Sequence, residues 1–135
     1  MMSMLTRCMC ALVFLSGCNL DSEVDCVEVP TSCAPLYEPT FDNVYAQTLA
    51  PKCAVGGGSC HSASGAQGNL VLEGVDLAYD GLTSNGLLDG SSPGCGILAK
   101  RLESNDSSYV MPIGAKLSEA ERCAVHLWIQ AGGER

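Results

Sequence analysis

Apolar residues recur at helical spacing in a first segment, residues 41–50. Positions i, i+3, i+4, i+7 and i+8 of this segment fall on one side of an α-helix. Thr40 can cap the start of the helix, and Pro51 is expected to end it. The predicted inward face consists of Phe41, Val44, Tyr45, Thr48 and Leu49.

The clearest helical pattern is the last one in the chain. Ser118 and Glu121 have the spacing of a capping box, and the pair Gly132-Gly133 is expected to end the helix. His126 falls on the polar side and is expected to be solvated. The predicted apolar face consists of Ala120, Cys123, Ala124, Leu127, Trp128 and Ala131.

Two weaker helical patterns lie between these segments. Residues 76–82 predict one or two turns with Leu77 and Leu82 inward, and Ser92 is expected to cap a further helix with Pro93 at its first position. In that helix Ile97, Leu98 and Leu102 should face the core, with Lys100 and Arg101 solvated. No segment alternates apolar and polar residues as a strand does. The sequence therefore predicts a mainly α fold of short helices with long loops.

The first residues have the pattern of a lipoprotein signal peptide, residues 1–17. A short segment with Arg7 precedes a compact apolar run, and Leu15-Ser-Gly-Cys18 follows. Cys18 is the expected lipidation site, which would anchor the chain to a bacterial membrane on the periplasmic or cell-surface side. An ordinary secretory signal with an incidental cysteine is the alternative. Either signal implies export to an oxidising compartment, where disulfides persist.

Residues 18–35 are acidic and rich in Ser and Pro, and we expect a solvated tether ahead of a folded domain, residues 36–135. Loss of Arg7 with the signal changes the formal net charge from −8 to −9. No basic patch is present, so nucleic acid is not an expected partner. Of the nine cysteines, Cys8 and Cys10 leave with the signal and Cys18 carries lipid. Proximity along the chain favours Cys26 with Cys33, Cys53 with Cys60, and Cys95 with Cys123.

Four residues suggest a covalently attached haem. Cys60 and His61 are adjacent, Cys53 precedes them, and Met111 is the only methionine that remains after signal removal. Thiols can bond to the haem vinyl groups, while imidazole and thioether are axial iron ligands. The usual motif has two residues between the cysteines, whereas this chain has six, three of them glycines. Such a spacer can loop out, and it equally suits a Cys53–Cys60 disulfide.

The same residues could also serve other chemistry. Cys53, Cys60 and His61 offer three zinc ligands, although a structural zinc site needs a fourth. A Cys60 nucleophile beside His61 would require an orienting third group. His126 is the second histidine and the reserve axial ligand if Met111 is not used.

The order of these pieces resembles the small c-type cytochrome domains of exported proteins and lipoproteins of myxobacteria and planctomycetes. The resemblance covers roughly residues 41–133. Its matching pieces are Leu49-Ala-Pro-Lys52 before Cys53, Cys60-His61, Gly68-Asn-Leu-Val-Leu72, Ile97–Leu102, Met111-Pro112, Leu117-Ser-Glu119 and Trp128-Ile-Gln-Ala-Gly132.

The resemblance implies a class I cytochrome c-like fold in which the first and last helices cross and Phe41 or Tyr45 packs near Trp128. It also implies haem c held by Cys53 and Cys60, with His61 and Met111 as axial ligands. The expected function is electron transfer with redox protein partners, by an electron carrier rather than an enzyme. The alternatives are a haem-free, disulfide-stapled lipoprotein used for interaction or assembly, and a haem-bearing accessory of an oxidase or dehydrogenase complex.

Overall fold

The computed structural model describes residues 25–55 and 60–135, and over these residues the chain is mainly helical without strands. A π-helical turn, Tyr45–Leu49, joins the first two helices, and 3₁₀ turns occupy Gln67–Asn69 and Pro93–Cys95. The α-helices are α1 (Phe41–Val44), α2 (Ala50–Lys52), α3 (Val75–Ser84), α4 (Ile97–Glu103) and α5 (Glu119–Gln130). The predicted mainly α class is thus confirmed, whereas the predicted signal peptide and Cys18 lie outside the described residues.

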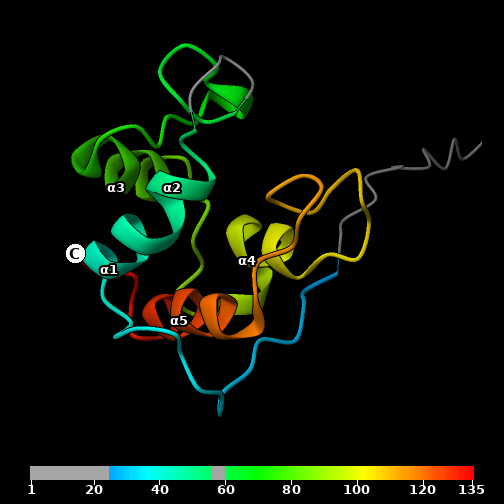
Figure 1. Cartoon of the computed structure of the whole chain (residues 1–135). Coiled ribbons are helices and arrows are strands. Elements are labelled where there is room, and N and C mark those ends of the chain that lie inside the picture. Colours follow the sequence, from blue (N-terminus) through cyan, green and yellow to red (C-terminus); the bar gives the residue numbers. More distant parts are fainter. Residues whose placement is uncertain (1–24, 56–59) are drawn as a thin grey trace, which may run out of the picture.

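Helix α5 contacts both α1 and α4 (Figure 1). Its capping box is present, because Ser118 Oγ accepts from the Glu121 amide at 3.3 Å and the Glu121 carboxylate accepts from the Ser118 amide at 3.0 Å. Gly132 and Gly133 then turn the chain out of the helix with φ of 113° and 64°. Both predicted ends of this helix are confirmed.

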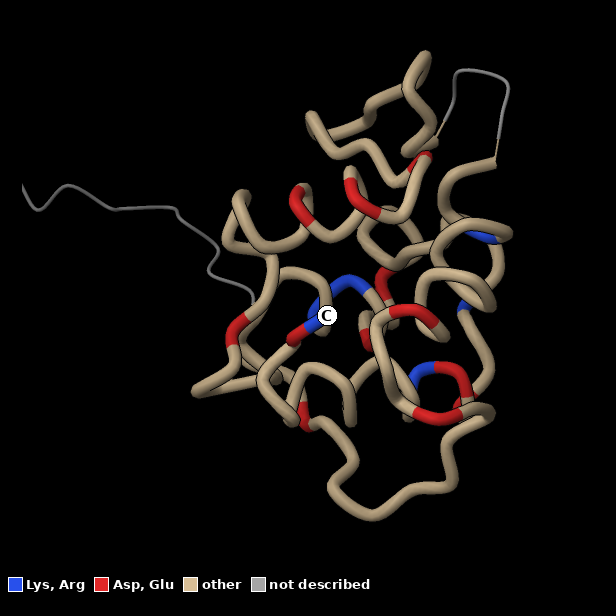
Figure 2. Tube along the Cα trace, turned by 90° about the vertical axis from the view of Figure 1, so that its left-hand side faces the viewer, with Lys and Arg blue, Asp and Glu red and all other residues tan. Residues whose placement is uncertain are grey.

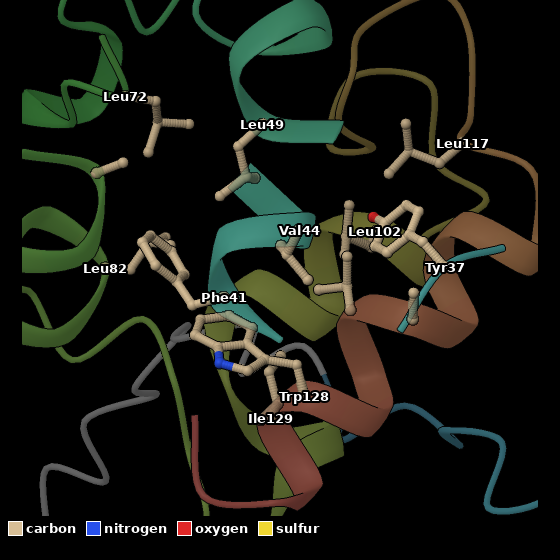
Figure 3. Close-up of a cluster of buried hydrophobic side chains, with 13 residues drawn as sticks. Tyr37, Phe41, Val44, Leu49, Leu72, Leu82, Leu102, Leu117, Trp128 and Ile129 are labelled. Carbon is tan, nitrogen blue, oxygen red and sulfur yellow. The ribbon is translucent and has the colours of Figure 1, made fainter. Parts of the chain in front are cut away.

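The aromatic core lies between α1 and α5. The rings of Phe41 and Trp128 are 5.3 Å apart, and Tyr79 from α3 meets Phe41 edge-on at 5.0 Å. Figure 3 shows Phe41 and Trp128 directed toward each other within the cluster of buried apolar side chains. Each buried aromatic ring contributes a large apolar area, so this contact joins the first and last helices.

The first helical segment keeps the predicted face but not the predicted end. Thr40 caps α1, and Phe41, Val44, Thr48 and Leu49 are buried. The chain stays helical past Pro51, however, because the preceding turn is widened and the Ala50 amide bonds to the Tyr45 carbonyl, five residues back. A π-turn accommodates a proline, whose ring clashes with the carbonyl four residues before it in a regular α-helix.

Two predicted orientations and one predicted helix start are wrong in α3 and α4. Leu82 is buried, but Leu77 is 57% exposed, since positions five apart point about 140° away from each other on a helix. In α4, Leu102 is buried while Ile97 is 46% exposed. The expected helix start at Ser92 is also wrong: Pro93–Cys95 forms a separate 3₁₀ turn, and Gly96 precedes α4 without a side-chain cap.

His126 is wholly buried rather than solvated. Helix α4 packs against this side of α5, and Glu103 at the end of α4 lies 2.8 Å from His126 Nε2. Arg122 Nε also binds the Glu103 carboxylate at 2.8 Å. The side of α5 that looks polar in the sequence is therefore an interface between two helices, closed by an internal ionic cluster.

The disulfides are Cys26–Cys95 and Cys33–Cys123, so the predicted partners are wrong although these same four cysteines form the bonds. The segment from Cys26 onward is bound to the domain rather than forming a free tether. The Val27 amide donates to the Gly94 carbonyl at 2.9 Å, and a Cβ on Gly94 would lie 2.0 Å from the Val27 oxygen. Proximity along the chain failed because it ignores this close approach of two distant segments.

The Cys33–Cys123 bond should contribute strongly to stability. Replacing both cysteines by alanine should lower the free energy of unfolding by about 3–5 kcal/mol, because the bond closes a long loop. Guanidinium denaturation of the disulfide-bonded protein would measure this loss. Peptide mapping without reduction provides the control, and recovery of a Cys26–Cys33 peptide would contradict the structure.

Acid should weaken the contact between α4 and α5. Burial lowers the pKa of His126 below its usual 6.5 despite the neighbouring Glu103 carboxylate, which opposes the shift. A group with a lowered pKa contributes stability above its unfolded pKa and loses it as the pH falls through the folded value. The free energy of unfolding should therefore decrease below about pH 6.5. His126→Gln should flatten this dependence just below about pH 6.5; an unchanged slope in denaturation curves would refute the assignment.

Candidate functional site

A cavity of about 590 Å³ lies between the helices. Its volume is within the range of roughly 300–1,000 Å³ that is usual for ligand sites. Most of its wall is aliphatic, with contributions from Leu49, Leu72, Leu82, Leu102, Leu117 and Val125. These residues come from every large helix and from two loops, so the cavity is a property of the whole fold.

The cavity brings together the four residues that the sequence singled out. Cys53, Cys60, His61 and Met111 all line it, although Met111 is fifty positions beyond His61. Cys53 follows α2, Cys60 and His61 begin the segment toward α3, and Met111 lies in the loop between α4 and α5. Two thiols, an imidazole and a thioether thus share one apolar cavity.

The His61 ring is held by the backbone. Its Nδ1 atom lies 3.2 Å from the Leu70 carbonyl oxygen, and a carbonyl can only accept a hydrogen bond. Nδ1 therefore carries the proton, which leaves the Nε2 lone pair for a metal. The His61 carbonyl accepts from the Leu72 amide at 2.7 Å, so the backbone of this residue is also fixed.

Neither disulfide involves Cys53 or Cys60. Burial, with a smaller contribution from Cys60, raises the pKa of the Cys53 thiol to about 11. Cys53 is therefore protonated at neutral pH. The His61 amide donates to the Cys53 carbonyl at 3.1 Å, which draws the two ends of the spacer together. Residues 56–59 of the spacer lie outside the described part of the chain.

Met111 is half-buried in a loop without helix or strand. Its amide donates to the Arg101 carbonyl at 2.9 Å, which ties the loop to the end of α4. Pro112 and Ile113 line the cavity beside it. The thioether is therefore supplied by a segment whose position depends on contacts with α4.

The charges of the cavity wall are opposite in sign to those of the chain as a whole. Along the chain trace, aspartate and glutamate positions outnumber those of lysine and arginine (Figure 2). Among the described residues that line the cavity, however, Lys52 and Arg101 are the charged ones and no carboxylate is present. An apolar ligand that carries carboxylate groups would suit this wall.

These two cations were not identified as site residues from the sequence. Arg101 was expected to be solvated, but it is half-buried and donates to the Tyr109 carbonyl at 3.1 Å. Lys52, which precedes Cys53, forms an ion pair with the buried Glu121 carboxylate. Its position next to a candidate cysteine was the available signal, whereas the contact of Arg101 with Tyr109 has no counterpart in local sequence.

The structure disfavours two alternatives for the same residues. Among residues 25–55 and 60–135, no three His, Cys, Asp or Glu side chains are placed to hold a metal ion together, which argues against zinc on Cys53, Cys60 and His61. The reserve ligand His126 binds Glu103 and does not line the cavity. Met111 is therefore the better placed partner for His61.

The raised pKa of Cys53 has a measurable consequence in the haem-free protein. Alkylation of Cys53 should be half-maximal near pH 11 in the folded state, against roughly 8.5 when unfolded. At pH 8 the folded protein should react on the order of a hundredfold more slowly, which is about the ratio of the two thiolate fractions. Because folding favours the protonated Cys53 thiol, this thiol contributes to the free energy of unfolding at neutral pH. The contribution is lost as the pH rises toward 11. Quantitative mass spectrometry of the Cys53 peptide would test this, with the denatured protein as control; equal rates would contradict the burial.

None of the described helices is long and apolar enough to cross a bilayer. Comparison with known proteins found no matching family model, no matching characterised sequence and no matching solved structure. The function must therefore be inferred from the cavity and the residues around it.

Proposed function

We propose that this chain is a membrane-anchored monohaem c-type cytochrome that transfers electrons between redox proteins. The observation that supports this most directly is that Cys53, Cys60, His61 and Met111 line one apolar cavity of about 590 Å³. These are the residue types that attach haem c and ligate its iron. When bound, haem would supply an iron centre that accepts and releases one electron.

The residues around the cavity fit this group. The proton on His61 Nδ1 is held by the Leu70 carbonyl, so Nε2 is available as the proximal ligand. Met111 is the candidate distal ligand, and Cys53 and Cys60 would hold the group through thioether bonds. No metal-binding set of protein side chains competes for these ligands among the described residues.

The fold supports the same proposal. The resemblance to small c-type cytochromes implies contact between the first and last helices with Phe41 or Tyr45 near Trp128, and Phe41 lies 5.3 Å from the Trp128 ring. The two disulfides suit an exported protein. Together with the lipoprotein pattern that ends at Cys18, they favour a periplasmic or cell-surface position on a membrane.

The wall of the cavity would influence the reduction potential of the bound haem. Aliphatic side chains around the group exclude water and lower the local dielectric constant, and Met/His ligation raises the reduction potential. Val55, Ile97 and Ile113 line the cavity and are also 45%, 46% and 70% exposed. The cavity wall is therefore partly exposed at these residues, where an edge of the group could face a redox partner.

The test is expression of the exported protein with the c-type maturation machinery. The wild-type protein should retain haem on a denaturing gel, with an intact mass of one haem and two disulfides. Cys53→Ser with Cys60→Ser should abolish covalent attachment. Met111→Ala should keep the haem but lower the reduction potential by on the order of 100 mV, because a thioether favours the reduced iron.

Cys26→Ser with Cys95→Ser is the matched control, because it also removes two cysteines, neither of which lines the cavity. This double variant should retain the haem stain. A protein that matures without haem and contains a Cys53–Cys60 disulfide would refute the cytochrome proposal. That outcome would instead support the haem-free, disulfide-stapled lipoprotein.

A further inference from the structure

The segment from Ser104 to Ser118, which carries Met111, contains no helix and no strand. Its ends are attached to the cluster around Glu103. Lys116 Nζ donates to the Glu103 carbonyl at 2.8 Å, and Arg122 donates to the Leu117 carbonyl. These contacts fix the base of the loop, but they do not reach its middle, where Met111 lies.

Arg101 contacts the middle of the loop at three points, beside the buried side chain of Val110. Its Nη1 atom donates to the Tyr109 carbonyl at 3.1 Å, and its guanidinium carbon lies 3.9 Å from the centre of the Tyr109 ring. Its own carbonyl accepts from the Met111 amide at 2.9 Å. The side chain and the main chain of Arg101 therefore hold the two sides of the short stretch from Tyr109 to Met111.

Arg101 also lines the cavity together with Met111, so both residues belong to the same wall. It lies on α4, which is fixed behind the cavity by the contact of Glu103 with His126 and Arg122 at 2.8 Å each. A guanidinium suits this position because it is planar, donates in its plane and stacks with its face. A lysine ammonium can make either contact but not both at once.

We propose that Arg101 is the positioning residue that keeps Met111 at the cavity wall. This inference rests on the proposed function in so far as Met111 is an axial ligand. Its structural part, that Arg101 orders the middle of the loop, holds independently of haem. When the Arg101 side chain is replaced, the backbone bond to the Met111 amide remains, but both contacts with Tyr109 are lost. The stretch before Met111 then moves more freely, so the thioether leaves the wall more often.

The first experiment uses the haem-free protein and measures amide hydrogen exchange of the peptide that contains Met111. Arg101→Ala should accelerate this exchange by roughly ten- to a hundredfold, because a charge-assisted hydrogen bond and a cation–π contact are lost. Arg101→Lys should give an intermediate rate, and Tyr109→Leu, which removes the ring but keeps the carbonyl, a smaller increase of about threefold. Peptides of α5 report whether each variant is folded.

Lys100→Ala is the matched control, because it removes the adjacent cation on the same helix, which does not line the cavity. Its exchange should equal that of the wild type. If the Met111 peptide exchanges at the wild-type rate in Arg101→Ala, the positioning role is refuted.

The second experiment uses the haem-loaded protein and follows the weak charge-transfer band of methionine-ligated ferric haem. Arg101→Ala should keep covalent haem. As the pH rises, this variant should lose the band about one pH unit below the wild type, which is the shift expected when the restraint on Met111 is tenfold weaker. Met111→Ala marks complete loss of the band.

The two failures are distinguishable. If the wild-type spectrum already equals that of Met111→Ala, Met111 is not a ligand and that part of the proposed function fails, while the exchange data still decide the ordering role. If the band of Arg101→Ala responds to pH as in the wild type, Arg101 does not position Met111 and the cytochrome proposal stands.

Discussion

The constraint on which this structure depends is that a small domain encloses a large cavity. Side chains that would fill the interior of an ordinary domain here form walls around about 590 Å³. Close packing is the main source of stability in small proteins, so the walls need other support. The structure provides it through the Phe41–Trp128 contact, the Glu103 cluster between α4 and α5, and two disulfides.

Different contacts stabilise the two sides of the cavity. The aromatic core fixes α1 against α5, and the wall near Cys53 follows directly from α2. The wall near Met111 has no regular structure and depends on side chains that reach it from α4 and α5. A cavity built in this way has one rigid wall and one wall that is set by a few polar contacts.

The sequence predicted the elements whose signals are local. The capping box of Ser118 and Glu121 and the glycines after α5 act within one helical turn, and both ends were correct. The disulfide partners, the burial of His126 and the contact of Arg101 with Tyr109 could not be predicted, since each depends on segments that meet only in the folded chain. Leu77 was misplaced for a different reason, because two leucines five positions apart cannot share one face.

The candidate site was more predictable than its surroundings. A haem site requires thiols, an imidazole and a thioether, and these residue types are rare enough after residue 18 to be found by elimination. The charge of the cavity wall was not predictable, because the overall acidity of the chain gives no indication that Lys52 and Arg101 face the same space.

The Cys26–Cys95 bond also determines how far the domain can stand from a membrane. If the lipid is attached at Cys18, as proposed, the anchor is eight residue steps from Cys26, the first point fixed to the domain, with seven residues between them. Even fully extended, such a segment spans at most about 28 Å. The domain would then remain close to the lipid headgroups and have little freedom to search for distant molecules. A redox partner would have to reach it at the bilayer surface, either by diffusing in the same membrane or by binding there from solution.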